Sequence, residues 1–194
     1  MEPVFTLPYS EYAAANLLSA RFTSKDGYSV FVPASRQQKG VDLLLAKRNS
    51  GGTGCISIQV KSSRTYMPPP AKRARTKRFA YYTWFNTFAV APEADFFLLF
   101  GLYPGDEDRS KKSDASWWKS LVLAFSNAEM TAFIESIKTR KHARDPMFGF
   151  GFDGPLEVHL TRGDPDRTLP SFSHHVLERQ LTKVGHALDA RCRK

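Results

Sequence analysis

Apolar and polar positions along the chain follow two periods, and the period changes at residues that favour turns. An apolar stripe at helical spacing predicts a helix that begins near Glu11, with Ser10 as its N-cap. The same spacing predicts helices over 127–138 and 175–190. Alternating or continuous apolar runs predict strands over 28–32, 41–46, 55–61, 79–88, 95–100, 121–125 and 156–160.

The order of these elements, a helix followed by strands and then by strands mixed with helices, is typical of an α/β or α+β domain with a mixed sheet. A length of 194 residues fits one domain. We expect residues 1–194 to form it, with a core over about 8–140 and a C-terminal helical extension over about 141–194. Prolines and charged residues replace the apolar pattern over 67–78 and 104–116, which predicts two loops.

The chain carries 28 Lys and Arg against 19 Asp and Glu, a net charge of +9, and five of the basic residues lie in the segment 71–78. This surplus fits a polyanionic partner, above all nucleic acid, as well as it fits a basic surface without a partner, and it fits an anionic membrane surface less well. Two cysteines exclude a disulfide scaffold and a four-cysteine zinc site. The apolar runs are too short to span a membrane and the N-terminus lacks a basic signal region, so we expect a cytoplasmic protein that does not act at a membrane.

Three patterns match known motifs only in their letters. Gly149, Gly151 and Gly154 satisfy G-x-G-x-x-G, but no helix signal follows them, so a glycine-rich turn is predicted. The S-x-x-K tetrapeptide at 116–119 lacks the companion motifs of its enzyme class. The two histidines at 174–175 have no metal-ligating residue at a suitable spacing, which favours a helix-capping or surface pair.

One carboxylate, Asp42, interrupts an apolar strand. Gln59 and Lys61 lie on the polar face of the next strand, beyond a hairpin, and adjacent strands are about 4.8 Å apart, so the three side chains can converge. Glu11 on the helix stripe adds a second acid. Two carboxylates, an amide oxygen and a lysine suit a hard divalent cation that acts on phosphate. The alternative is an ion pair between Asp42 and Lys61 at a sheet edge, with Gln59 solvated and Glu11 facing the helix dipole.

The pattern that carries this chemistry has three parts: Glu11 on the first helix, GVDLL at 40–44 and IQVKSS at 58–63. Over roughly residues 8–64 it resembles the PD-(D/E)xK nuclease superfamily, nearest to the Q-x-K branch that includes Mrr-type restriction nucleases, and it is similar to Holliday-junction resolvases. The resemblance implies a restriction-endonuclease-like core, in which helices flank a central mixed β-sheet. It also implies hydrolysis of phosphodiester bonds with Mg²⁺, for which Mn²⁺ can substitute.

By position, the resemblance implies that Asp42 is the main metal ligand, that Gln59 occupies the usual second acid position and that Lys61 is the catalytic lysine. It also implies that the Val60 carbonyl ligates the ion and that Glu11 reaches it through water. The neutral amide of Gln59 departs from the commonest pattern, because it removes one negative charge from the metal site.

The expected function is an endonuclease on DNA, in restriction, repair or defence, and the expected partner is therefore nucleic acid. A homodimer or a partner subunit would supply the second active site that cutting both strands requires. The alternative is a catalytically inactive nucleic-acid-binding module, or a subunit of a larger nuclease complex, with the same fold. A basic segment such as 71–78 also matches a nuclear-localisation pattern. Phosphate contacts are expected from Ser62, Ser63, Arg64, Lys72, Arg73, Arg75, Lys77 and Arg78.

Overall fold

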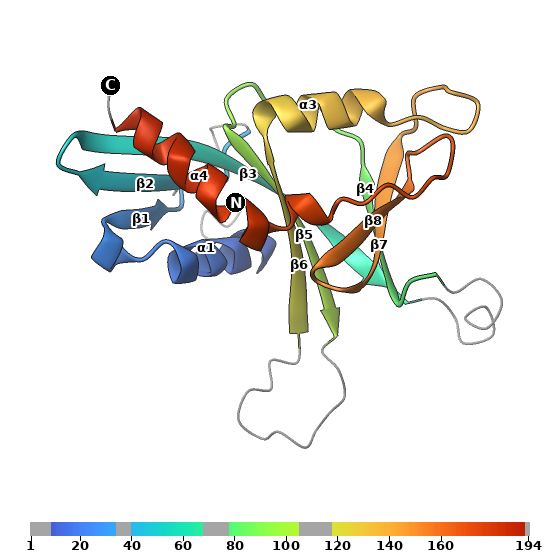
Figure 1. Ribbon diagram of the computed structural model, residues 1–194, viewed down its shortest axis with the longest axis horizontal. Coiled ribbons are helices and arrows are strands. Elements are labelled where there is room, and N and C mark those ends of the chain that lie inside the picture. The colour runs from blue at the N-terminus through green and yellow to red at the C-terminus, as the bar shows by residue number, and fades with distance from the viewer. Residues whose placement is uncertain (1–8, 34–39, 68–77, 105–117, 193–194) are drawn as a thin grey trace, which may run out of the picture.

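The computed structural model describes residues 9–33, 40–67, 78–104 and 118–192. These residues form an α+β protein in which an eight-stranded sheet packs with three α-helices (Figure 1). The helices are α1 (Tyr9–Arg21), α3 (Asn127–Ser136) and α4 (Leu177–Arg191), with 3₁₀ turns at Ser24–Asp26 and Ser173–His175. The strands are β1 (Tyr28–Phe31), β2 (Leu43–Asn49), β3 (Gly52–Tyr66), β4 (Tyr81–Asn86), β5 (Phe96–Pro104), β6 (Trp118–Ser126), β7 (Met147–Gly154) and β8 (Glu157–Arg162).

Strand β3 belongs to both halves of the sheet. Its first part pairs with antiparallel β2, and its middle lies parallel to β5. Its last residues, Thr65 and Tyr66, pair instead with β4. The first half-sheet therefore runs β1-β2-β3-β5-β6, and the second continues from the end of β3 through β4 and β7 to β8. Among the described strands, every pairing except β3 with β5 is antiparallel.

Two apolar cores lie on opposite faces of the first half-sheet. On one face, α1 and α4 bury side chains that include Leu18 and Val184 together with Ile58 of β3. The other face packs with α3 and with the inner face of the second half-sheet. Strand β5 is buried on both faces, with Leu98 in the first core and Leu99 in the second, which explains its continuous apolar run.

Strand β7 corrects the prediction of a glycine-rich turn near residue 149. The phenylalanines of its FGFGF sequence point into the core and are fully buried. The glycines between them lie on the opposite face, where a Cβ at Gly149 would collide with Trp84 and a Cβ at Gly151 with Phe79. Glycine is needed here for close packing and not for a turn. Strand β8 follows this segment directly, so the next element after these glycines is a strand and not a helix.

Most other elements are confirmed with shifted ends. Helix α1 begins at Tyr9, so the prediction of Ser10 as the N-cap was wrong, whereas Ser126 caps α3 in a capping box with Glu129. The C-terminal segment expected as a helical extension also supplies β7 and β8 to the sheet. The predicted loops 67–78 and 104–116 lie almost wholly outside the described residues. None of the helices described is long and apolar enough to cross a membrane.

His175 is a core residue. Its ring stacks on Phe125 with centroids 3.9 Å apart, and its Nδ1 donates to the carbonyl oxygen of Ala124 at 3.2 Å. Burial, helped by the neighbouring His174, lowers the pKa of His175 from 6.5 to about 4. The histidine pair therefore supports packing between β6 and the start of α4.

This burial predicts a pH-dependent stability. The unfolded chain binds a proton at His175 near pH 6.5 and the folded chain only near pH 4, so stability falls as the pH drops through this window. The loss expected from this residue is about 3 kcal/mol. Urea unfolding of His175→Gln should show a flatter profile between these pH values, whereas the exposed His186→Gln control should not. Equal slopes in wild type and His175→Gln would contradict the assignment.

Candidate active site

Strand β3 changes its neighbours in the middle of its length. Its pairing with β2 ends at Ile58, and its pairing with β4 begins at Thr65. From Ile58 to Arg64 it stays paired with β5. The stretch that carries Gln59 and Lys61 thus lies where the two half-sheets diverge. Along this stretch, β5 is the one described strand that pairs with β3.

Asp42 occupies the start of this gap. Its backbone N–H donates to the carbonyl oxygen of Ile58 at 2.9 Å, and its side-chain Oδ2 accepts the N–H of Val60 at 2.7 Å. The carboxylate therefore lies against the peptide that joins Gln59 to Val60, and it takes the place of the strand partner that β2 no longer supplies. Within the described part of the chain, Oδ1 accepts no hydrogen bond and can face a ligand.

Gln59 is buried, with 7% of its surface exposed, and its Oε1 has no hydrogen-bond donor among the described residues. Its side chain shares a sheet face with Phe97, its register partner on β5, and so points away from α1 and α4. A buried amide oxygen without a donor costs about 1–3 kcal/mol. A cation or an ordered water at this position would remove that cost.

Lys61 lies two residues further along the same face of β3. Its Nζ is 5.1 Å from the centroid of the Phe88 ring, a cation–π contact that holds the ammonium over the ring. Around it is a pocket of about 280 Å³, which we call the Lys61 pocket. Its lining residues are Lys61, Ser62, Trp84, Phe85, Asn86, Thr87 and Phe88.

A hard divalent cation suits the oxygens at this gap. Mg²⁺ is usually held by one or two carboxylates and keeps several waters, so Asp42 and Gln59 are a sufficient protein share. No group of three or more His, Cys, Asp or Glu side chains that suits a metal ion is found in the described ranges. The candidate site therefore depends on one carboxylate and one amide.

The other two expected metal ligands are the Val60 carbonyl and Glu11. Val60 uses its N–H to hold Asp42, and its side chain is buried in the core under α1 and α4. Glu11 is half-buried in the first turn of α1, the helix that covers the sheet face opposite Gln59 and Lys61. The role of Glu11 and that of the Val60 carbonyl stay predictions.

The residues expected to contact phosphate differ in their exposure and in the hydrogen bonds that they already make. Ser62 is exposed in the Lys61 pocket, and Arg64 is exposed on β3. The Ser63 hydroxyl lies 2.7 Å from the carbonyl oxygen of Trp84 and 3.1 Å from its backbone nitrogen, so it fastens β4 to β3. Arg78 is exposed, and Lys72, Arg73, Arg75 and Lys77 lie outside the described residues.

The sequence offers Tyr81, Tyr82 and Trp84 either as core residues, the favoured interpretation, or as a surface that stacks on bases. Tyr81 packs against the core, but Trp84 on the other face of β4 is 39% exposed, and its ring centroid lies 4.6 Å from that of Tyr66. The burial pattern of β4 separates the two interpretations residue by residue. Nothing in the local pattern indicated that Phe88 meets Lys61.

Comparison of the chain with protein-family models, curated proteins and solved structures found no match. The candidate site therefore depends on its own geometry and on the spacing of Asp42, Gln59 and Lys61.

Because the buried Oε1 of Gln59 has no donor among the described residues, its removal has a predictable effect on stability. Gln59→Met removes that oxygen at similar volume, so we expect the free energy of unfolding to stay equal or rise by about 1 kcal/mol. Gln59→Glu buries a charge, so we expect a lower Tm in EDTA and a larger rise of Tm with Mg²⁺ than in wild type. Thermal unfolding with Mg²⁺ and with EDTA measures both effects.

The matched control is Gln180→Glu on α4, which should not respond to Mg²⁺. If Gln59→Met lost more than about 2 kcal/mol, the amide oxygen would have an energetically important partner and the site as described would be wrong.

Proposed function

We propose that the chain is a Mg²⁺-dependent endonuclease that hydrolyses phosphodiester bonds of DNA. Two observations carry the proposal: the Asp42 carboxylate contacts the Gln59–Val60 peptide, and the buried amide oxygen of Gln59 has no hydrogen-bond donor among the described residues. Lys61 follows two residues later and borders a pocket. A mixed sheet with β5 parallel to β3, and with α1 and α4 on one face, supports a restriction-endonuclease-like core.

Each side chain has a distinct task in this proposal. Mg²⁺ held by Asp42 and Gln59 supplies a Lewis acid and an activated water when bound. The N–H of Val60 fixes the Asp42 carboxylate before substrate arrives, so little reorganisation is needed. The ammonium of Lys61 offsets the negative charge that develops on the phosphate, and the exposed Ser62 hydroxyl donates to a phosphate oxygen.

The second candidate is a nucleic-acid-binding module without turnover. Gln59 favours it, because a neutral amide in place of an acid weakens the attraction of the site for a divalent cation. The Lys61 pocket and the ammonium of Lys61 would then bind phosphate without cleaving it.

Cleavage of supercoiled plasmid separates the two functions. We expect wild type to nick DNA with Mg²⁺ or Mn²⁺ and not in EDTA. Asp42→Asn and Lys61→Met should each lower the rate by about 100-fold or more, because each removes charge stabilisation in the transition state. Linear product at early times would indicate two active sites, as in a homodimer.

The control is Lys25→Met, an exposed lysine in the 3₁₀ turn after α1, which should cleave as wild type does. Nicking that survives both Asp42→Asn and Lys61→Met would contradict the proposal. A gel shift without nicking by wild type, on plasmid and oligonucleotide substrates, would favour the binding module.

A further inference from the structure

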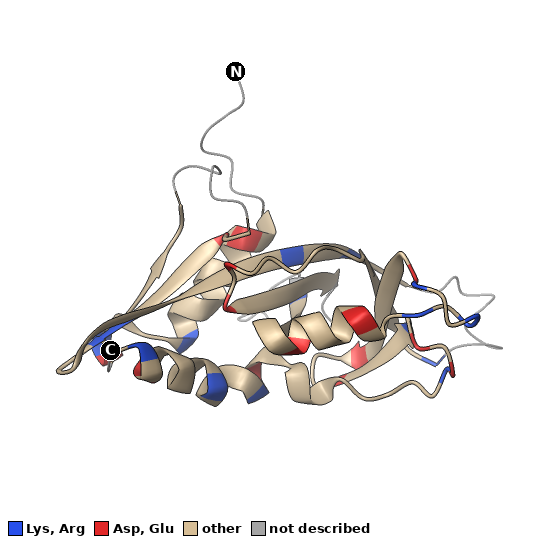
Figure 2. Cartoon of the chain, turned by 90° about the horizontal axis from the view of Figure 1, so that it is seen from above, with Lys and Arg blue, Asp and Glu red and all other residues tan. Residues whose placement is uncertain are grey.

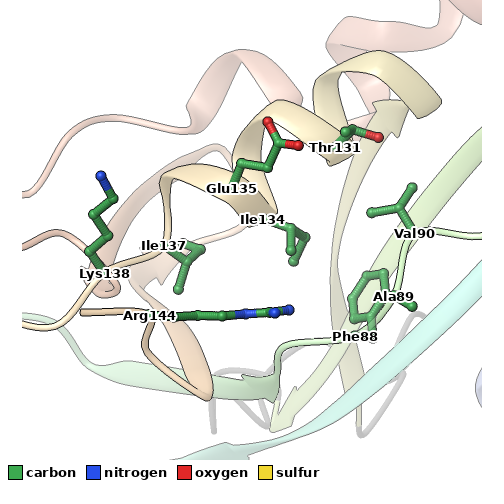
Figure 3. A pocket seen from close by; sticks show the side chains of 9 residues that line it. All are labelled: Phe88, Ala89, Val90, Thr131, Ile134, Glu135, Ile137, Lys138 and Arg144. Atoms are coloured by element: carbon green, nitrogen blue, oxygen red, sulfur yellow. The ribbon is translucent and has the colours of Figure 1, made fainter. Parts of the chain in front are cut away.

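Three pockets adjoin one another on the side of the molecule that holds Lys61. The Lys61 pocket shares Phe88 with a second pocket of about 510 Å³ between α3 and the segment after β4 (Figure 3). It shares Trp84 with a third pocket of about 700 Å³ between the loops that follow α3 and β8. The second and third pockets share Lys138. Each pocket thus has one lining residue in common with each of the other two, and we call the three neighbouring pockets together the band.

The turn that follows α3 supplies most of the charge of this band. Residues 138–144 read KTRKHAR, with four basic residues and no acidic one. A β-bridge between Lys138 and Arg144 closes the turn, and the N–H of Thr139 donates to the carbonyl oxygen of Ala143 at 2.7 Å. His142 adopts a φ of 57°. The turn is thus held by its own backbone, and all four of its basic residues are exposed.

Two neighbouring acids, Asp145 and Asp164, have their partners outside this turn. Asp145 pairs with Arg162, whose Nε and terminal nitrogen lie 3.2 and 2.9 Å from its two carboxylate oxygens. Oδ2 of Asp164 accepts three hydrogen bonds from Thr168 and Leu169 of its own loop. Within the described residues no ion pair involves Lys138, Arg140, Lys141, Arg144 or Arg167.

Arg144 connects the turn to the candidate active site. In Figure 3 its side chain extends along the second pocket towards Phe88, whereas Lys138 points away and Glu135 lies above on α3. Lys61 contacts the same Phe88 ring from its own pocket. Arg144 thus shares a pocket with Phe88, the residue whose ring Lys61 contacts, and no ion pair joins Glu135 to Arg144 in the described structure.

We propose that this band binds the sugar-phosphate backbone of a nucleic-acid strand that continues from the Lys61 pocket to the basic turn 138–144. The inference rests on the proposed function, because it identifies the path of the same substrate. Unpaired cations along a hollow supply affinity for phosphates without sequence preference. The exposed Trp84, at the border of two pockets, supplies a surface on which a base can stack. In Figure 2, Lys and Arg recur, together with some Asp and Glu, along the loops at the end of the molecule opposite the C-terminus.

A nucleic acid suits these features better than a membrane does. The cations line the same pockets as Trp84 and Phe88, which fits a chain of phosphates and bases. An anionic bilayer would favour basic residues on an amphipathic helix with an exposed apolar face. The basic residues here lie instead on a closed turn and on the loop that holds Arg167.

The test compares two triple variants with equal loss of charge. In the turn variant, Arg140, Lys141 and Arg144 are changed to Gln. In the control variant, the exposed Lys25, Arg48 and Arg179 are changed to Gln. Fluorescence anisotropy of a labelled single-stranded oligonucleotide is measured over a range of salt in EDTA, so that cleavage plays no part.

We expect the turn variant to bind at least tenfold more weakly than the control variant near physiological salt. Its slope of log K against log salt should be smaller by about 2, the value for three lost phosphate contacts. Trp84→Leu should weaken binding at least fivefold without changing the salt slope, because stacking releases no counterions. Thermal unfolding checks that every variant is folded.

Equal binding by the turn and control variants would overturn the proposal, because charge in general would then explain the affinity. Binding of anionic phospholipid vesicles that falls in the turn variant, while oligonucleotide binding does not, would also overturn it and assign the surface to a membrane. Failure of the proposed function gives a different result. In that case the turn variant still loses affinity, but wild type with Mg²⁺ cuts no DNA.

Discussion

The change of partner along β3 is the constraint on which the candidate site depends. A strand that lost a neighbour in the middle of a sheet would leave backbone groups unpaired, and Asp42 satisfies one of them by accepting the N–H of Val60. The same bond brings the carboxylate to the peptide that follows Gln59. The divergence of the half-sheets also leaves room for the segment after β4 to place Phe88 against Lys61. One hydrogen bond thus connects the architecture of the sheet to the chemistry proposed for it.

Charge and aromatic rings extend this arrangement beyond the gap. The basic turn after α3 and the pocket of Lys61 come from distant parts of the sequence, and they meet because β7 pairs with β4 and brings the end of α3 alongside it. The glycines of β7 make that approach possible, since Gly149 leaves room for the ring of Trp84. Asp145 is occupied in an ion pair and Asp164 in hydrogen bonds of its own loop, so neither pairs with the basic turn.

The local parts of the fold and of the site were predictable from the sequence. Residues 43–58 form a hairpin whose register follows from a short turn and from alternation, so the approach of Asp42 to Gln59 could be inferred. The parallel pairing of β3 with β5, the pairing of β4 with β7 and the position of Phe88 involve residues far apart in sequence, and periodicity carries no signal for them. Strand β7 was misread because its alternating glycines suggest a turn unless the rings packed against them are known.

Crystallography in the presence of Mn²⁺ tests the central claim most directly, because anomalous scattering locates that ion without reference to any activity. The account predicts an anomalous peak coordinated by Oδ1 of Asp42 and Oε1 of Gln59 in wild type, and a peak that is absent in Asp42→Asn. Well-ordered crystals of wild type with no peak at these oxygens, or with the ion bound elsewhere in the chain, would contradict it.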